Sequence, residues 1–213
     1  MDPVPATAKT SDAYKVAACY PGELAHMEQV ARLAVMLFAE CRELHRMGTW
    51  ELEMLACAAL LHDVGISVDY RGHHKKSQKL IMRLDLPSCT TREREIIATV
   101  ARYHRKAHPS VRHKPFKTLS SADRQTVKRL AALLRPADGL DRAHECAVTD
   151  LNATRKLSAL WNIAIRGPGD LSYAAWAGER KAGLFEEVFG VRLRFEAAGR
   201  AGDDMSGPDG EGF

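Results

Sequence analysis

The residues in this sequence best suited to chemistry are His62 and Asp63, an adjacent pair at the end of an apolar run, followed farther along by His73 and His74. Imidazole nitrogens and carboxylate oxygens are ligands for divalent transition metals such as zinc, iron, manganese and nickel. The same His-Asp pair could also be two polar residues that end a helix and bind no metal. The elements that carry the other His and Asp residues therefore decide between a metal site and a helix terminus.

Five helices are predicted from apolar residues that recur at steps of three and four. Gly48 and Gly65 follow the first two helices as terminators, and Thr90 with Glu93 has the form of a capping box that opens the fourth. Pro136 is expected to kink the fifth helix or end it near Arg135, because proline lacks the backbone N–H. The predicted helices span residues 23–46, 50–62, 73–84, 90–105 and 121–134.

Each of these helices places a polar residue in phase with its apolar face, so these side chains are expected to point toward the core. A single buried histidine is usually satisfied by hydrogen bonds, but several imidazoles with two carboxylates are costly to bury without a cation. We therefore predict a metal site. Because His73 directly precedes His74, an exchange between these two neighbours stays open. The predicted ligands are His26, His62, Asp63, His74, His104 and Asp138.

Composition restricts the class of protein. A chain of 213 residues with 46% hydrophobic residues can form one sizeable core. No apolar stretch approaches the roughly 20 residues needed to cross a bilayer, and the first residues lack the apolar region of a signal peptide. The five cysteines are odd in number and include no C-x-x-C pair, which argues against disulfides and a cysteine zinc site and indicates a cytoplasmic protein.

The charge pattern favours a small anionic partner. The formal charge of +4 is too small to imply nucleic acid, yet residues 102–117 contain basic residues and no acid. Only Tyr103 and Phe116 accompany this basic stretch, which is too few aromatic residues for a platform that stacks nucleic-acid bases. Nucleic acid and membrane are therefore unexpected as partners.

The domain organisation follows from changes in sequence pattern. Residues 1–12 and 198–213 are predicted to be disordered, and residues 13–155 to form the helical metal-binding domain. Residues 156–197 are predicted to pack on it as a strand-helix-strand element. We expect its large aromatic side chains to belong to the core, namely Trp161, Trp176, Phe185 and Phe189.

The segments LLHDVGISVDYRGHHKKSQKLI, VARYHRKAHP and LLRPADGLDRAH together resemble the HD-domain superfamily of metal-dependent phosphohydrolases. The closest resemblance is to the C-terminal HD domain of the exopolyphosphatase/guanosine pentaphosphate phosphatase family, and it covers roughly residues 20 to 196. It implies a mainly α fold, an HD helical bundle with a small C-terminal strand-helix-strand element.

The resemblance also implies roles for single residues. His26, His62, Asp63 and Asp138 would hold one divalent ion (Mn, Fe, Zn or Ni). A second ion would lie between His74 and His104, with Asp63 bridging the two. Such ions activate water, so a serine or cysteine nucleophile is not required. The predicted catalytic residues are Asp63, Lys75 and Arg105, and those predicted to bind substrate phosphate are Lys75, Arg105, Lys106 and Arg142.

Two departures from the family keep a second hypothesis open. Full-length members carry an actin-like pair of domains to which polyphosphate hydrolysis is attributed, and that activity is not expected of this module. Members often have Glu at the position of Asp63 and then assist binding or dimerisation, whereas here the His-Asp pair is intact. The main prediction is a phosphohydrolase acting on a nucleotide-like or other phosphate ester. The alternative is a non-catalytic module that binds polyphosphate or an alarmone, or that dimerises with itself or a separate partner.

Overall fold

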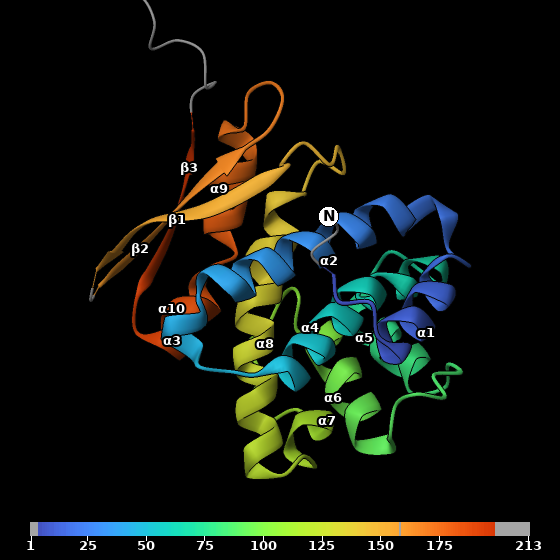
Figure 1. The fold of residues 1–213 in the computed structure, drawn as a ribbon. Helices are drawn as coiled ribbons and strands as arrows, with labels where there is room; N and C mark the ends of the chain where they lie inside the picture. Colours follow the sequence, from blue (N-terminus) through green and yellow to red (C-terminus); the bar gives the residue numbers. More distant parts are fainter. Residues whose placement is uncertain (1–3, 158, 199–213) are drawn as a thin grey trace, which may run out of the picture.

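Helices dominate the fold, as predicted (Figure 1). The computed structural model describes residues 4–157 and 159–198. The helices of this part are α1 (Ala8–Ala17), α2 (Pro21–Glu40), α3 (Arg42–His45), α4 (Thr49–Leu61), a 3-10 turn η1 (Val64–Ser67), α5 (His73–Ile81), α6 (Thr91–Arg102), α7 (Lys114–Lys117), α8 (Ser121–Leu140), α9 (Ser172–Arg180) and α10 (Gly183–Phe189). The mainly α fold class is therefore confirmed.

The five predicted helices correspond to α2, α4, α5, α6 and α8, with one interruption. The first ends at Glu40 and resumes as α3 after Cys41. The imidazole of His45 terminates this region: its Nε2 donates to the carbonyl of Phe38 at 2.7 Å and its Nδ1 accepts from the amide of Met47 at 2.9 Å. Both ring nitrogens are thus satisfied, so His45 has a structural role.

The prediction of disorder over residues 1–12 is wrong from residue 8 onward. Thr7 and Thr10 form a capping box that starts α1, and the Asp12 carboxylate accepts from the amide of Ser88 at 2.9 Å. Ala13 and Ala17 are fully buried. The segment has few large apolar residues, so these tertiary contacts were not visible in its pattern. The predicted tail beyond residue 198 lies outside the described residues.

Helix α8 continues through Pro136 to Leu140, so of the two predicted outcomes, a kink or an end near Arg135, the end is wrong. Residues 130–140 are buried, and α8 packs against α2 on one side and against α9 and α10 on the other. This packing keeps the last turn helical although Pro136 donates no backbone hydrogen bond. The extra turn matters because it carries Asp138.

The predicted capping box at Thr90 is confirmed. The Thr90 hydroxyl accepts from the amide of Glu93, and the Glu93 carboxylate accepts from the amide of Thr90 at 2.9 Å. The same carboxylate accepts from Trp50 Nε1 at 2.9 Å and pairs with Lys9 at 3.2 Å. Burial opposes ionisation, but these hydrogen bonds prevail and lower the pKa of Glu93 to about 2. This carboxylate therefore joins α1, α4 and α6.

A three-stranded sheet stands at one side of the helices, with α9 behind it and α10 below it near α3 (Figure 1). Its strands are β1 (Asp150–Leu157), β2 (Leu160–Arg166) and β3 (Arg192–Ala197). Strands β2 and β3 are parallel, with α9 and α10 as the crossover, which is the predicted strand-helix-strand unit with its helix in two pieces. Strand β1, antiparallel to β2, was not predicted.

One aromatic residue of this element differs from the prediction. Trp161 and Phe185 are buried, but Trp176 is 53% exposed, so its assignment to the core is wrong. Helix α9 packs on α8 through its small residues, since the carbonyl of Ala177 and the Cα of Gly178 lie against Gly139. Trp176 is on another face of α9, where no element covers it fully.

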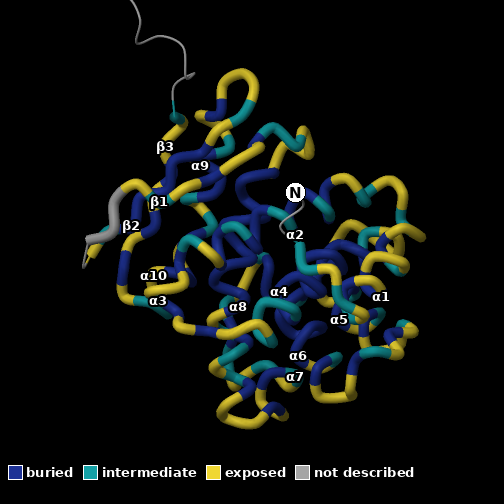
Figure 2. Tube along the Cα trace, viewed as in Figure 1, coloured by how far each residue is buried: buried dark blue, intermediate teal, exposed yellow. Residues whose placement is uncertain are grey.

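Figure 2 shows that buried residues are concentrated along α4 and the upper part of α8. Helices α2 and α6 each pack against α4 and α8 there, and α5 packs against α6. Within the described residues, no helix has both the length and the apolar character of a membrane span.

Candidate metal centre

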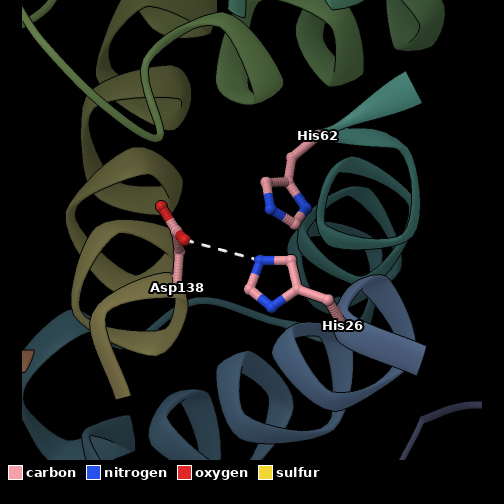
Figure 3. A group of neighbouring side chains, drawn as sticks. All are labelled: His26, His62 and Asp138. Atoms are coloured by element: carbon pink, nitrogen blue, oxygen red, sulfur yellow. Dashed lines mark ion pairs between the residues drawn. The ribbon is translucent and has the colours of Figure 1, made fainter. Parts of the chain in front are cut away.

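Two groups of buried side chains that could hold a metal ion lie where α2, α4, α5, α6 and α8 meet. His26, His62 and Asp138 form one group, which Figure 3 shows converging from α2, α4 and α8. Asp63, His73 and His104 form the other. Within each group the ligand atoms lie within 4.8 Å of one another.

The carboxylate of Asp63 lies between the two groups. Its Oδ2 is 3.3 Å from His62 Nε2 and 3.8 Å from His26 Nε2, while its Oδ1 is 3.1 Å from His73 Nε2 and 3.5 Å from His104 Nε2. His26 Nε2 is also 3.7 Å from Asp138 Oδ1, the pair joined by the dashed line in Figure 3. Asp63 is thus the residue that faces both groups.

The hydrogen bonds of the imidazoles fix which nitrogen is available. The Nδ1 atoms of His62, His73 and His104 contact the carbonyls of residues 59, 70 and 101 at 2.7, 3.0 and 2.7 Å. Because a carbonyl can only accept, each Nδ1 must carry a proton, and each ring in its neutral form would present a bare Nε2 lone pair. These lone pairs face the interior of the site.

His26 follows the same pattern with a carboxylate in place of a carbonyl. Its Nδ1 donates to Asp141 Oδ2 at 2.8 Å, which turns Nε2 toward Asp63 and Asp138. Histidine ligands of metals characteristically donate the other ring N–H to a carbonyl or carboxylate. All four histidines of the two groups have this arrangement.

The structure places His73, and not His74, beside Asp63. Helix α5 packs closely on η1: a side chain at Gly65 would collide with the backbone of His73 and Ser77, and the Gly65 amide donates to Ser77 Oγ at 3.0 Å. This contact turns the His73–Ser77 face of α5 toward Asp63. The prediction of His74 followed the apolar phase of Ile81, which lies on another face of the helix.

His74 instead lines a neighbouring pocket of about 360 Å³ with Lys75, Arg102 and Lys106. Burial and the positive charges nearby, first that of Arg105, lower the pKa of His74 to about 4. It is therefore a neutral imidazole at pH 7, outside both ligand groups.

The electrostatics of the site favour cations. Burial disfavours the imidazolium of His26, yet the nearby carboxylates of Asp138 and Asp141 raise its pKa to about 9. Burial also opposes ionisation of Asp138, but Lys181 and His26 hold its pKa well below the usual range. His104 is fully enclosed, and this burial lowers its pKa to about 3. A proton on His26 thus balances carboxylate charge that a metal could balance instead.

Sequence reasoning did not identify Lys181 or Asp141, and it placed His144 outside the ligand set. The Lys181 ammonium, at the end of α9, forms an ion pair with Asp138 Oδ2. The His144 ring stacks on that of His26 with centroids 3.8 Å apart. Asp141 and His144 follow Asp138 closely in sequence, and that proximity was the available signal. Lys181 lies in a separate element, so no spacing in the sequence indicated it.

Not every predicted phosphate-binding residue reaches the site. A hollow of about 30 Å³ at the ligands is lined by Asp63, Asp138, Arg105, Arg142 and Lys181, among others. Arg105 Nη1 lies 3.2 Å from His73 Nε2, so its guanidinium borders the second group. Lys75 is exposed and lines the pocket of His74, and Lys106 lines that pocket and an outer groove.

A larger and mostly apolar cavity of about 840 Å³ lies between α1 and α2, lined by Tyr14, Glu28 and Arg32 among others. None of the ligands of the two groups lines it. Its size alone therefore gives no reason to place chemistry there.

Comparison with known proteins identifies a matching family and several curated relatives. The family described as Ppx/GppA phosphatase, domain III, matches residues 9–165. Among curated proteins, the chain is 29% identical over 146 residues to the guanosine-5'-triphosphate,3'-diphosphate pyrophosphatase of Vibrio cholerae serotype O1 (67% of this chain and 29% of the relative). It is 28% identical over 150 residues to that of Vibrio atlanticus and 25% over 140 residues to that of Aliivibrio fischeri. The chain thus spans less than a third of the length of these relatives.

Proposed function

Since the chain belongs to the Ppx/GppA phosphatase domain III family, we propose that it is a metal-dependent phosphohydrolase of HD type that acts on phosphate esters. The observation that carries the proposal is the pair of ligand groups, His26, His62 and Asp138 beside Asp63, His73 and His104. We propose that each group contributes to holding a divalent ion, manganese, iron, zinc or nickel, with Asp63 contributing to both.

The residues fit such ions. His26 Nε2 and His62 Nε2 are buried and have no hydrogen-bond partner in the described part of the chain. His73 Nε2 and His104 Nε2 lie 3.2 Å apart, both of their Nδ1 atoms are directed to carbonyls, and the guanidinium of Arg105 donates to His73 Nε2 at 3.2 Å. Buried lone pairs in this arrangement are costly unless a cation lies among them. Divalent ions supply Lewis-acid chemistry, polarising a phosphoryl group and activating water.

The protein residues have separate tasks in this scheme. Asp141 and the carbonyls that accept from Nδ1 hold the histidines in one tautomer and orientation. Asp63 and Asp138 supply the negative charge that makes the site selective for cations. Arg105 and Arg142 border the hollow and would bind the phosphoryl oxygens of the substrate.

Lys181 adds a further group to the predicted set. Its ammonium neutralises Asp138, and it lines both the hollow and the groove outside it. We propose that, if Asp138 held a metal, the Lys181 ammonium would be available to bind a phosphate oxygen of the substrate. Lys75 is proposed no longer as a catalytic residue, because it does not line the hollow.

The test combines elemental analysis of the purified protein with a phosphate-release screen over nucleotides, cyclic dinucleotides, alarmones and polyphosphate. We expect bound transition metal and release of phosphate from at least one ester. Asp63→Ala should release metal and abolish hydrolysis. Asp69→Ala is the matched control, because Asp69 is an exposed carboxylate in the same loop region that pairs with Lys76.

The alternative predicted from the sequence, a non-catalytic module that binds polyphosphate or an alarmone or that dimerises, gives a different result in this screen. Metal-loaded protein would hydrolyse nothing and would still bind polyphosphate through residues 102–117. Activity that disappears in Asp63→Ala and persists in Asp69→Ala would exclude it.

A further inference from the structure

A groove beside the ligand groups combines aromatic and cationic side chains. It has a volume of about 390 Å³, within the range of about 300–1,000 Å³ typical of small-molecule sites. No carboxylate occurs among its lining residues, all of which belong to the described part of the chain. They are Arg105, Lys106, Arg142, Tyr173, Trp176, Ala177, Arg180 and Lys181.

The aromatic pair of the groove lies on one face of α9. Tyr173 and Trp176 are one helical turn apart, with ring centroids separated by 5.6 Å and an interplanar angle of 31°. Tyr173 is 52% and Trp176 53% exposed. Arg180, the next turn along, places its guanidinium carbon 5.2 Å from the Trp176 centroid, a cation–π contact that restrains the indole.

Exposed aromatic rings beside cationic side chains are suited to bind a ligand that has a flat aromatic base and phosphate groups. Large apolar side chains left exposed together next to a polar cleft mark binding sites more often than chance surface residues do. A flat aromatic base can stack on such rings, and cationic side chains around them attract phosphate. The groove offers both kinds of contact within one cavity.

The groove is continuous with the metal centre. Arg105, Arg142 and Lys181 line both the groove and the hollow at the ligand groups. A ligand with a base on Trp176 could therefore direct its phosphates along these cations toward Asp63 and Asp138. An inorganic phosphate chain would use the cations and leave the rings uncovered.

We propose that the Tyr173–Trp176 face of α9 is a base-stacking subsite, which makes the substrate of the proposed phosphohydrolase a nucleotide instead of an inorganic polyphosphate. This inference rests on the proposed function only in calling the bound nucleotide a substrate. The stacking subsite itself stands on the exposed rings and the cations of the groove.

Binding is tested by isothermal titration calorimetry of the full chain with two probes of similar charge, guanosine triphosphate and inorganic tripolyphosphate. We expect the nucleotide to bind wild-type protein more tightly. Trp176→Ala should weaken nucleotide binding on the order of tenfold and leave tripolyphosphate binding within about twofold of wild type, because one stacked base is lost. Trp176→Phe should retain most of the affinity.

Two further variants keep the test decisive. Tyr173→Ala removes the neighbouring ring and should weaken the nucleotide alone if Trp176→Ala does not fold. Tyr14→Ala is the matched control, since Tyr14 is an aromatic residue 45% exposed on α1 and does not line this groove.

The proposal is overturned if guanosine triphosphate and tripolyphosphate bind wild type equally, or if Trp176→Ala weakens both to the same extent. Tighter binding of a single-stranded oligonucleotide than of the nucleotide would also overturn it, because the groove would then serve nucleic acid. Phosphate release is measured separately on the same preparations. Stacking that persists without any hydrolysis would refute the proposed function and leave the subsite intact.

Discussion

The contact between α8 and α9 at Gly139 connects the fold to the metal centre, and Gly139→Ala perturbs it. A Cβ at residue 139 would lie 2.6 Å from the carbonyl oxygen of Ala177 and 2.8 Å from the Cα of Gly178. Both atoms belong to backbone, so no side-chain rotation can relieve the overlap. The two helices must separate by roughly 1 Å to restore ordinary contact distances.

The magnitude follows from two opposing effects. Overpacking of this kind costs about 1–3 kcal/mol, and alanine recovers up to about 1 kcal/mol of helix propensity relative to glycine. We expect a net loss of about 1–2 kcal/mol in the free energy of unfolding. For a chain of this size, that corresponds to a melting temperature lower by about 2–8 °C. Movement of α9 should also draw Lys181 away from Asp138.

The assay is denaturant unfolding with a thermal scan on the same preparation. Gly22→Ala is the matched control, because a Cβ at Gly22 has no atom within 4 Å and should be neutral or stabilise by less than about 1 kcal/mol. If Gly139→Ala is as stable as wild type, the close contact between the two helices is not as described, and the reasoning that places Lys181 from it fails.

Three further predictions concern single side chains. His73→Ala should lower the metal content measured by elemental analysis while His74→Ala leaves it unchanged, and equal loss in both variants would make His74 a ligand after all. Glu93 has a pKa lowered to about 2 from its ordinary 4.5, so its carboxylate stabilises the fold above about pH 4.5 and this contribution is lost as pH falls toward 2. Glu93→Gln should therefore be less stable than wild type by about 1–2 kcal/mol at pH 7, a difference that disappears in acid; a pH-independent difference would contradict the assignment. Lys181→Ala should lower the melting temperature of chelator-treated protein, since Asp138 loses its partner. Addition of manganese should then raise the melting temperature by more than it does in wild type. A smaller rise than in wild type would show that Lys181 does not compete with the cation.

The candidate ligands on α2, α4 and α8 were accessible from sequence because each is in register with an apolar stripe. His26, His62 and Asp138 share the phase of residues that pack in the core, and helical periodicity carries that phase over several turns. The capping box at Thr90 and Glu93 was equally local, and both side chains bond as the motif predicts.

Helical periodicity gave the wrong residue on α5, because the face of that helix that lies toward the site is polar and not apolar. Helix α5 meets η1 through Ser77 and the backbone around Gly65, so the polar stripe that contains His73 faces Asp63. Pro136 is a second case, because local rules predict a kink or an end of the helix, and packing of α8 on both sides overrides the end. In both, contacts between elements distant in sequence decided the outcome.

The sequence by itself indicated five of the six candidate ligands and the helices that carry them, because side-chain chemistry and helical periodicity are local properties. Only the tertiary structure decided that Lys181 pairs with Asp138 and that Tyr173 and Trp176 stand exposed beside the same site. These depend on where α9 crosses α8, and that crossing is fixed by a backbone contact between two glycines that lie far apart in the chain. The apolar periodicity within α8 or α9 alone does not specify this contact.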